Sequence, residues 1–241
     1  MDSNLDQKGE RFLFCERNVV FALLMAVSGM MGAYTFTLRG GAFCNAQTAN
    51  IVLMSIAIGQ GRWLDGLYFL IPISAYFLGA FLSESLPTPV KSRHFLRWDT
   101  WLIGFEMVTM FILGFVPMDV PYQPIQVIIN FVASMQYNTF RQAEGIPMAT
   151  TFCTNHVRQM GIAAAKVLRH HDQKAAHRGK VHLAMLLSFF TGGVLLSRLG
   201  IYVQGKAIWL AVPPLLFIFI NLVHADLTTE HEYFDAKPRG H

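Results

Sequence analysis

Long uncharged runs of apolar residues alternate along the chain with short clusters of charged residues. A helix that crosses a bilayer needs about 20 mostly apolar residues. Six segments approach this length and are predicted as transmembrane helices: 18–38, 66–83, 100–118, 120–140, 183–197 and 207–223. The fifth segment is short, and we expect His182 or other polar residues to lengthen it at its ends.

Two further stretches, 40–61 and 145–169, leave the number of crossings open. The first is uncharged, and the second contains Arg158 and Lys166. Cytoplasmic loops are enriched in Lys and Arg. If both stretches enter the membrane and return, 15 of the 19 Lys and Arg residues lie inside and four outside. Two full crossings instead give ten against seven, with two cations inside a span. The distribution favours six crossings with both termini cytoplasmic.

The composition excludes several classes of protein. Hydrophobic residues make up 53% of the chain and charged residues 14%, with a mean hydropathy of +0.39, whereas soluble domains carry about a quarter charged residues. The net charge of +4 comes without a recognisable basic helix face, so nucleic-acid binding is not predicted. Three cysteines show no disulfide or zinc spacing and are expected to be reduced. The polar N-terminus precedes an apolar run too long for a cleaved signal peptide.

The two halves of the chain resemble one another, which predicts an internal repeat. The matching segments are 48–51 with 154–157, 82–84 with 196–198, and Trp101-Leu102 with Trp209-Leu210. Three crossings in each half are an odd number, so the second copy must be inverted, as in many secondary transporters. The predicted fold is an all-α polytopic membrane helix bundle of about six transmembrane helices, built as two inverted three-helix repeats that each contain a short re-entrant or half-helix. The predicted segments are a cytoplasmic N-terminus (1–17), two repeats (18–118 and 119–224) and a cytoplasmic tail (225–241).

Residues 29–52 read GMMGAYTFTLRGGAFCNAQTANIV. This string resembles the signature of the YoaK-like family of bacterial inner-membrane proteins, a domain of unknown function: a glycine-rich first helix, then F-x-(S/N)-x-x-T-G-N entering an apolar helix. The matching positions are Phe43, Asn45, Thr48 and Asn50. Ala49 replaces the usual Gly, and Gly32 stands where many members carry Asp, so no proton-coupling role of that Asp is transferred. The likeness continues through MQYNTFRQAEGIPMATTFCTN at 135–155 and implies a polytopic inner-membrane protein, but no reaction.

Polar side chains gather where each ambiguous stretch begins, and in lipid such groups must face protein or water. The predicted substrate-binding residues are Asn45, Gln47, Thr48, Asn50, Asn138, Thr154, Asn155, His156 and Arg158. Thr48, with Thr151 or Thr154 in the second copy, would cap a half-helix whose free N–H groups attract an anion. The alternative is that these residues only hold closely packed helices together.

Charged residues near the membrane suggest a second role. Glu106 is the only acid well inside a predicted span, which indicates proton coupling or a partner such as Arg141 or Arg158. The alternative is that its side chain reaches the cytoplasmic interface. Arg141 and Glu144, three residues apart, are expected to pair on a helix.

Histidines crowd a basic loop without a Cys or carboxylate pattern that would fix a metal, so no metal site is predicted. They are His170, His171, His177 and His182. A solvated loop or contact with anionic lipid is expected instead. No cofactor motif or catalytic constellation is recognisable, so neither a cofactor nor enzymatic activity is predicted.

These patterns support a small-molecule permease of the secondary type as the leading hypothesis, with its site between the two polar elements. A non-transporting membrane scaffold or sensor is the alternative, and a lipid-modifying enzyme is third. The expected partners are the lipid bilayer and a small-molecule substrate, with an anion as the class favoured by the helix starts; self-association stays open. The expected location is the bacterial inner membrane, with several passes.

Overall fold

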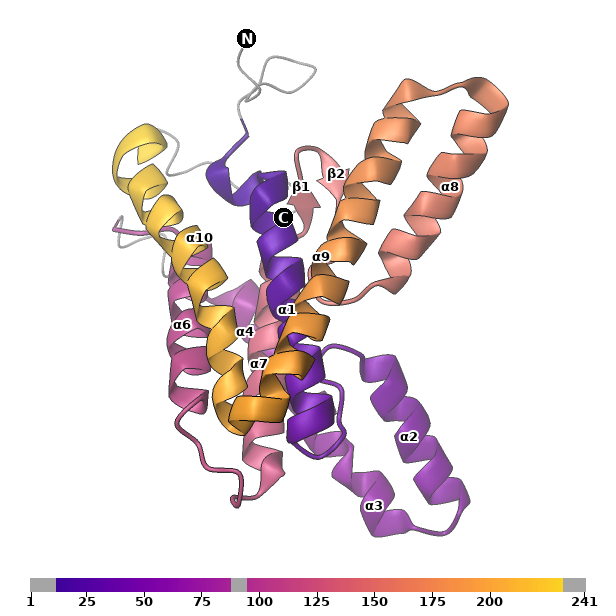
Figure 1. Ribbon diagram of the computed structural model, residues 1–241, viewed down its shortest axis with the longest axis vertical. Coiled ribbons are helices and arrows are strands. Elements are labelled where there is room, and N and C mark those ends of the chain that lie inside the picture. Colours follow the sequence, from indigo (N-terminus) through magenta and orange to yellow (C-terminus); the bar gives the residue numbers. More distant parts are fainter. Residues whose placement is uncertain (1–11, 88–94, 232–241) are drawn as a thin grey trace.

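The computed structural model describes residues 12–87 and 95–231, which form an almost wholly helical structure (Figure 1). The helices are α1 (Asn18–Leu38), α2 (Gln47–Gly59), α3 (Trp63–Tyr68), α4 (Leu70–Ser85), α6 (Trp98–Leu113), α7 (Tyr122–Thr139), α8 (Thr154–His170), α9 (Gln173–Val203) and α10 (Val212–His224). Shorter helical turns cover Phe14–Glu16, Gln204–Ala211 and Ala225–Thr229. A two-stranded antiparallel hairpin, β1 (Gln142–Ala143) and β2 (Ile146–Pro147), interrupts the helices. The all-α prediction is confirmed.

Three helical segments in the described part of the chain are long and apolar enough to cross a membrane: Asn18–Leu38, Trp63–Ser85 and Gln173–Thr229. The last contains both the fifth and the sixth predicted span. The predicted span 100–118 corresponds to α6, but this helix ends at Leu113 and its 16 residues extend only about 24 Å. Helix length and composition therefore support a membrane protein, but they identify three spans rather than six.

Two long helix pairs form the centre of the fold, because α1 packs along α9 and α4 packs along α7. Glycines permit the close approach of these pairs. A Cβ atom on Gly29 would lie 2.0 Å from the carbonyl oxygen of Phe189, and one on Gly192 would lie 2.0 Å from that of Ala26. A Cβ atom on Gly79 in α4 would lie 2.4 Å from the carbonyl oxygen of Phe131 in α7. Small residues at helix crossings are a common packing device in membrane bundles.

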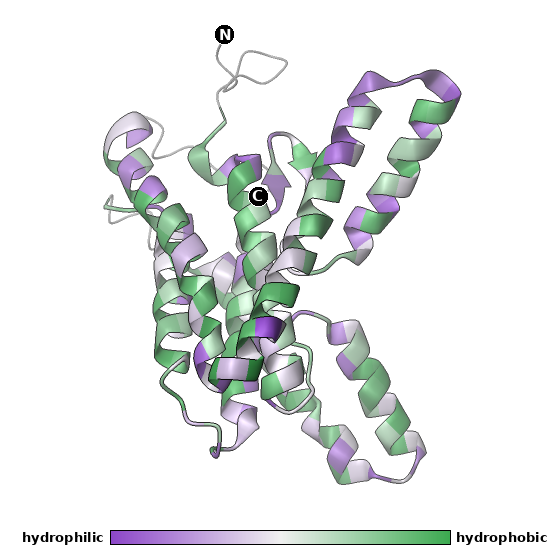
Figure 2. Ribbon diagram, viewed as in Figure 1, coloured by the Kyte–Doolittle hydropathy of each residue, from purple (hydrophilic) through white to green (hydrophobic). Residues whose placement is uncertain are grey.

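Two helical hairpins project from this body at opposite ends (Figure 1). We call them the α2–α3 arm (residues 47–68) and the α8–α9 arm (residues 154–182). They contain most of the two stretches whose crossing is ambiguous from the sequence. The 13 residues of α2 extend only about 20 Å, too short to span a bilayer core of about 30 Å. Hydrophobic residues dominate α2, whereas hydrophilic and hydrophobic residues alternate along α8 (Figure 2).

Buried ion pairs join the two ends of the described chain. The Arg97 guanidinium lies 3.6 Å from the Asp99 carboxylate through Nε and 3.4 Å from the Glu230 carboxylate through Nη1. The backbone N–H of Arg97 donates to the Asp226 carboxylate at 3.0 Å. The backbone N–H of Phe14 also donates to Glu230, at 2.7 Å. This network fixes the backbone at Phe14 and the segment from Asp226 to Glu230 against the start of α6. Most of the predicted cytoplasmic segments, 1–11 and 232–241, lie outside the described residues.

Candidate functional site

Ser28, in the middle of α1, connects two polar loops that are far apart in the sequence. The side-chain amide of Asn45, just before α2, donates to the Ser28 carbonyl at 3.2 Å. The side-chain amide of Gln136 in α7 donates to the Ser28 hydroxyl at 3.0 Å and to the carbonyl of Thr150, before α8, at 3.3 Å. All four residues are buried. We call Ser28, Asn45, Gln136 and Thr150 the polar junction.

Local sequence explains how Asn45 reaches the interior. A Cβ atom on Gly32 would lie 3.1 Å from the Asn45 side-chain nitrogen, so the glycine leaves space for this amide. Gly40 and Gly41 precede it with φ values of +86° and +77°, which ordinary L-residues rarely adopt. These glycines let the chain reverse after α1 and return alongside it.

Several acceptor atoms near the polar junction lack a partner. Among the residues that the structure describes, no hydrogen-bond donor reaches Gln136 Oε1, Thr150 Oγ1 or Asn50 Oδ1. A buried polar atom without a partner is costly, and in native proteins such an atom commonly marks a bound water, an ion or a functional role. The polar junction can therefore accept hydrogen bonds from a molecule that enters it.

A second line of hydrogen bonds starts at α2. The Gln47 side chain donates to Asn130 in α7 at 2.7 Å, and the Asn50 side chain donates to the Phe43 carbonyl at 2.9 Å and to Gln47 at 3.1 Å. These bonds hold the start of α2 against α7. Three of the predicted substrate-binding residues thus lie close together: Asn45 and Asn50 are buried, and Gln47 is half-buried.

Glu106 in α6 is fully buried. Within the described residues, neither of its carboxylate oxygens has a hydrogen-bond partner. The predicted pairing with Arg141 or Arg158 is wrong, because Arg141 pairs with Glu84 at 2.6 Å and Arg158 donates to Asn155 at 2.9 Å. The alternative that Glu106 reaches the interface is also wrong. An uncompensated carboxylate is expensive in such an interior, so the neutral acid is the favoured form there.

The predicted helix caps are wrong. Helix α2 begins at Gln47 with Ala46 as its N-cap, and α8 begins at Thr154 with Cys153 as its N-cap; neither N-cap makes a side-chain capping bond. Thr48 and Thr154 lie within the first turns and are exposed, as is Arg158. The structure therefore does not bring these three residues to the polar junction, and the anion site predicted at the helix starts lacks its capping geometry.

The predicted pair of Arg141 with Glu144 is also corrected. Helix α7 ends at Thr139, so these residues do not share a helix. Glu144 lies in the turn between β1 and β2 with φ +45°, and its carboxylate accepts hydrogen bonds from the backbone and side chain of Asn18. Asn138, predicted to bind substrate, instead donates to Ser83 at 2.8 Å and to Glu84 at 3.1 Å between α4 and α7.

His156 lies next to the polar junction. Its Nε2 atom is 2.7 Å from the carbonyl oxygen of Ala149, and its Nδ1 atom is 3.0 Å from Nδ1 of His182 in α9. Both rings are buried. Burial lowers the pKa of His156, while the bond to Ala149 raises it by a smaller amount. The pair joins the start of α8 to α9.

Sequence reasoning missed Ser28, Thr150 and Arg39. Arg39 is fully buried beyond α1, where its guanidinium donates to Tyr34 Oη at 2.9 Å and to the carbonyls of Val116 and Pro117 at 2.8 Å each. An arginine that directly follows an apolar run can be recognised in the sequence as a residue whose side chain holds the end of the helix. A serine within a glycine-rich helix is not a specific signal.

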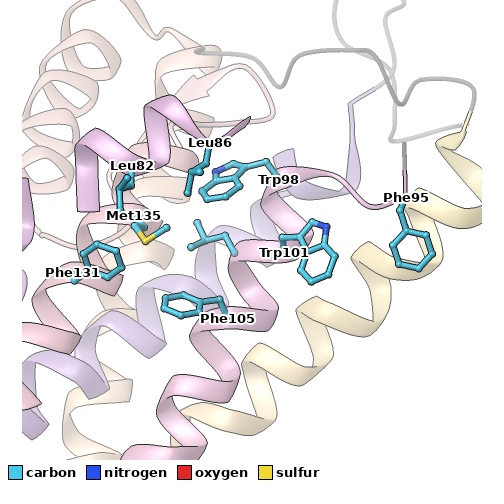
Figure 3. Close-up of a pocket in the computed structure, with 9 residues that line it drawn as sticks. Leu82, Leu86, Phe95, Trp98, Trp101, Phe105, Phe131 and Met135 are labelled. Atoms are coloured by element: carbon cyan, nitrogen blue, oxygen red, sulfur yellow. The ribbon is translucent and has the colours of Figure 1, made fainter. Parts of the chain in front are cut away.

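A groove lies on the surface of α4, α6 and α7, and none of the four residues of the polar junction lines it (Figure 3). It has a volume of about 550 Å³, and aromatic and aliphatic side chains line it, among them Leu86, Trp98, Trp101 and Phe105. Its apolar lining suits a hydrocarbon environment and does not suit a polar substrate.

The apolar helices, the buried polar interior and the exposed apolar surfaces define a helical protein of the membrane class. The chain belongs to the DUF1275 family, described as a protein of unknown function, whose family model matches residues 20–221. This match confirms the family resemblance that the sequence predicts. No curated protein and no solved structure matches the chain.

Proposed function

We propose that this chain is a secondary-type permease whose small polar substrate binds at the polar junction. The observation that supports this most is the meeting of the loop before α2 with α7 at Ser28, in the interior of apolar helices, with acceptors on Gln136 and Thr150 left unsatisfied. The unsatisfied atoms include amide oxygens, so they favour a substrate rich in hydrogen-bond donors, such as an amine, amide or polyol, over the anion expected from the sequence.

The proposed membrane arrangement has six crossings in two inverted repeats. The pairing of α1 with α9 and of α4 with α7 supports it, because each pair joins the first crossing of one half to the second crossing of the other. The projection of the two arms at opposite ends supports it as well (Figure 1). Inverted repeats of this kind place the substrate between the two halves, near the middle of the bilayer.

Glu106 is the proposed coupling group. A buried carboxyl without a partner can take up and release a proton, and intramembrane carboxyls of this kind mark ion and proton pathways. Proton-coupled movement of substrate would then require both the polar junction and Glu106.

The test is a screen of the purified protein for thermal stabilisation by amines, amides, polyols and organic anions, since a ligand that binds only the native state raises the melting temperature. Gln136→Met should remove the response to a ligand found in this way, and the exposed Thr48→Val should keep it. Uptake of that ligand into proteoliposomes completes the test. A Gln136→Met variant that melts earlier but responds fully to ligand would overturn the proposed site. Binding without uptake would leave the alternative, a membrane sensor or scaffold.

A further inference from the structure

The α8–α9 arm carries most of the excess positive charge. Residues 154–182 contain six Lys or Arg residues and one Asp, a net charge of +5 with His neutral, whereas the whole chain has +4. The six cations are Arg158, Lys166, Arg169, Lys174, Arg178 and Lys180, and all are exposed. The rest of the chain therefore has a net charge of −1. In the described part of the chain, Arg169 and Arg178 form no ion pair with a carboxylate.

Helix α8 has three distinct faces. Ala163 and His156 are buried towards α9, where a Cβ atom on Gly179 would lie 3.0 Å from the Ala163 methyl. Val157 and Leu168 are 59% and 81% exposed, and because 11 residues make about three turns they share one side of the helix. Arg158 and Arg169, each one residue further, share the adjacent side. The sequence alone does not predict a basic helix face, but α8 has one beside an exposed apolar face.

We propose that the α8–α9 arm lies along the membrane surface and binds the headgroups of anionic phospholipids. An apolar face next to a cationic face is the arrangement by which an interfacial helix inserts apolar side chains below the headgroups and places cations among the phosphates. A nucleic acid would leave Leu168 exposed. A second copy of the arm would bring two +5 surfaces together, and their repulsion disfavours that contact. The proposal is independent of the permease function.

The experiment uses the full chain in nanodiscs of phosphatidylcholine alone and of phosphatidylcholine with phosphatidylglycerol. Phosphatidylglycerol should raise the melting temperature of the wild type, and the rise should shrink as NaCl increases because salt screens exposed charges. The combined Lys166→Gln, Arg169→Gln and Arg178→Gln variant should lose at least half of this rise. Its matched control removes three exposed cations outside the arm: Arg62→Gln, Arg198→Gln and Lys206→Gln.

A second measurement does not depend on the stability of any variant. An environment-sensitive fluorophore on a cysteine at the exposed Ala165 should report a more apolar surrounding in phosphatidylglycerol nanodiscs than in phosphatidylcholine nanodiscs. Equal melting temperatures in the two lipids, an equal loss in the control variant, or an unchanged fluorophore spectrum would each overturn the proposal.

Discussion

The Nδ1 atoms of His156 and His182 lie 3.0 Å apart, while Nε2 of His156 faces the carbonyl oxygen of Ala149 at 2.7 Å. A carbonyl oxygen only accepts, so Nε2 of His156 carries a proton. Neutral His156 then accepts at Nδ1, and His182 must donate from its own Nδ1. The contact therefore requires at least one neutral ring, because two protonated rings would each present a donor at Nδ1 and would break it.

This contact predicts a loss of stability in mild acid. Burial lowers the pKa of His156 below its unfolded value of about 6.5, so its contribution to stability is complete above that pH and is lost as the pH falls through the folded pKa. We expect the melting temperature of the purified protein to fall between about pH 7 and pH 5. His156→Gln should lower the free energy of unfolding by about 1–3 kcal/mol at pH 8, and it should reduce the fall of the melting temperature between about pH 7 and pH 5. The exposed His177→Gln is the control, and a full acid-induced fall in His156→Gln would assign the effect to other groups.

The close crossing of α1 and α9 predicts a sharp difference between glycines. Gly29→Ala would place a methyl 2.0 Å from the Phe189 carbonyl oxygen. This clash would force α1 and α9 apart and should lower the free energy of unfolding by about 1–3 kcal/mol. No atom lies within 4 Å of a Cβ placed on Gly161 in α8, so Gly161→Ala should be neutral or stabilising by up to about 1 kcal/mol. Melting temperatures of the two variants in one detergent test this, and equal values would contradict the glycine crossing.

Arg39 provides a test of side-chain geometry. Its planar guanidinium donates to Tyr34, Val116 and Pro117 at the same time, and one lysine ammonium cannot reproduce this fork. We expect Arg39→Lys to lower the free energy of unfolding by about 1–3 kcal/mol, because buried acceptors lose their donors. Arg62→Lys, at an exposed ion pair, should change it by less than about 1 kcal/mol. Denaturant titration of both variants would show whether charge alone is sufficient.

The sequence predicts the apolar helices well because their signal is local. Helix α1 begins and ends where the predicted first span does, at Asn18 and Leu38. The ends of the predicted spans are less accurate where the chain turns. Arg141 and Glu144 are expected at the helical end of the fourth span, but α7 ends at Thr139, and the turn at Glu144 and Gly145, with φ +45° and +78°, forms the hairpin of β1 and β2 instead.

The candidate site could be predicted only in part, because its contacts are non-local. Asn45, Gln47 and Asn50 are recognisable as polar residues beside an apolar run. Which of them points inward depends on packing against α1 and α7. The bond between Gln136 and Ser28 joins residues 108 positions apart, and no spacing rule predicts such a contact. The same holds for Glu106, whose burial depends on three-dimensional packing rather than on its distance from the end of a span.

The tips of the two arms report the membrane topology. Gln60 and Gln173 are exposed at the tips of the α2–α3 and α8–α9 arms. Six crossings place the two tips on opposite sides of the membrane, with Gln60 outside, whereas eight crossings place both inside. In a background without Cys15, Cys44 and Cys153, an impermeant thiol reagent added to intact cells should therefore label Gln60→Cys and leave Gln173→Cys unlabelled.

Permeabilised cells are the control in this experiment, because both cysteines should then react and so show that each tip is accessible in the folded protein. Protection of Gln60→Cys in intact cells, with labelling after permeabilisation, would support eight crossings. An even number of crossings in each half would then remove the need for an inverted second copy. The polar junction would survive that result as a feature of the packing, but its place between two inverted repeats would not, and the transport proposal would lose its main architectural support.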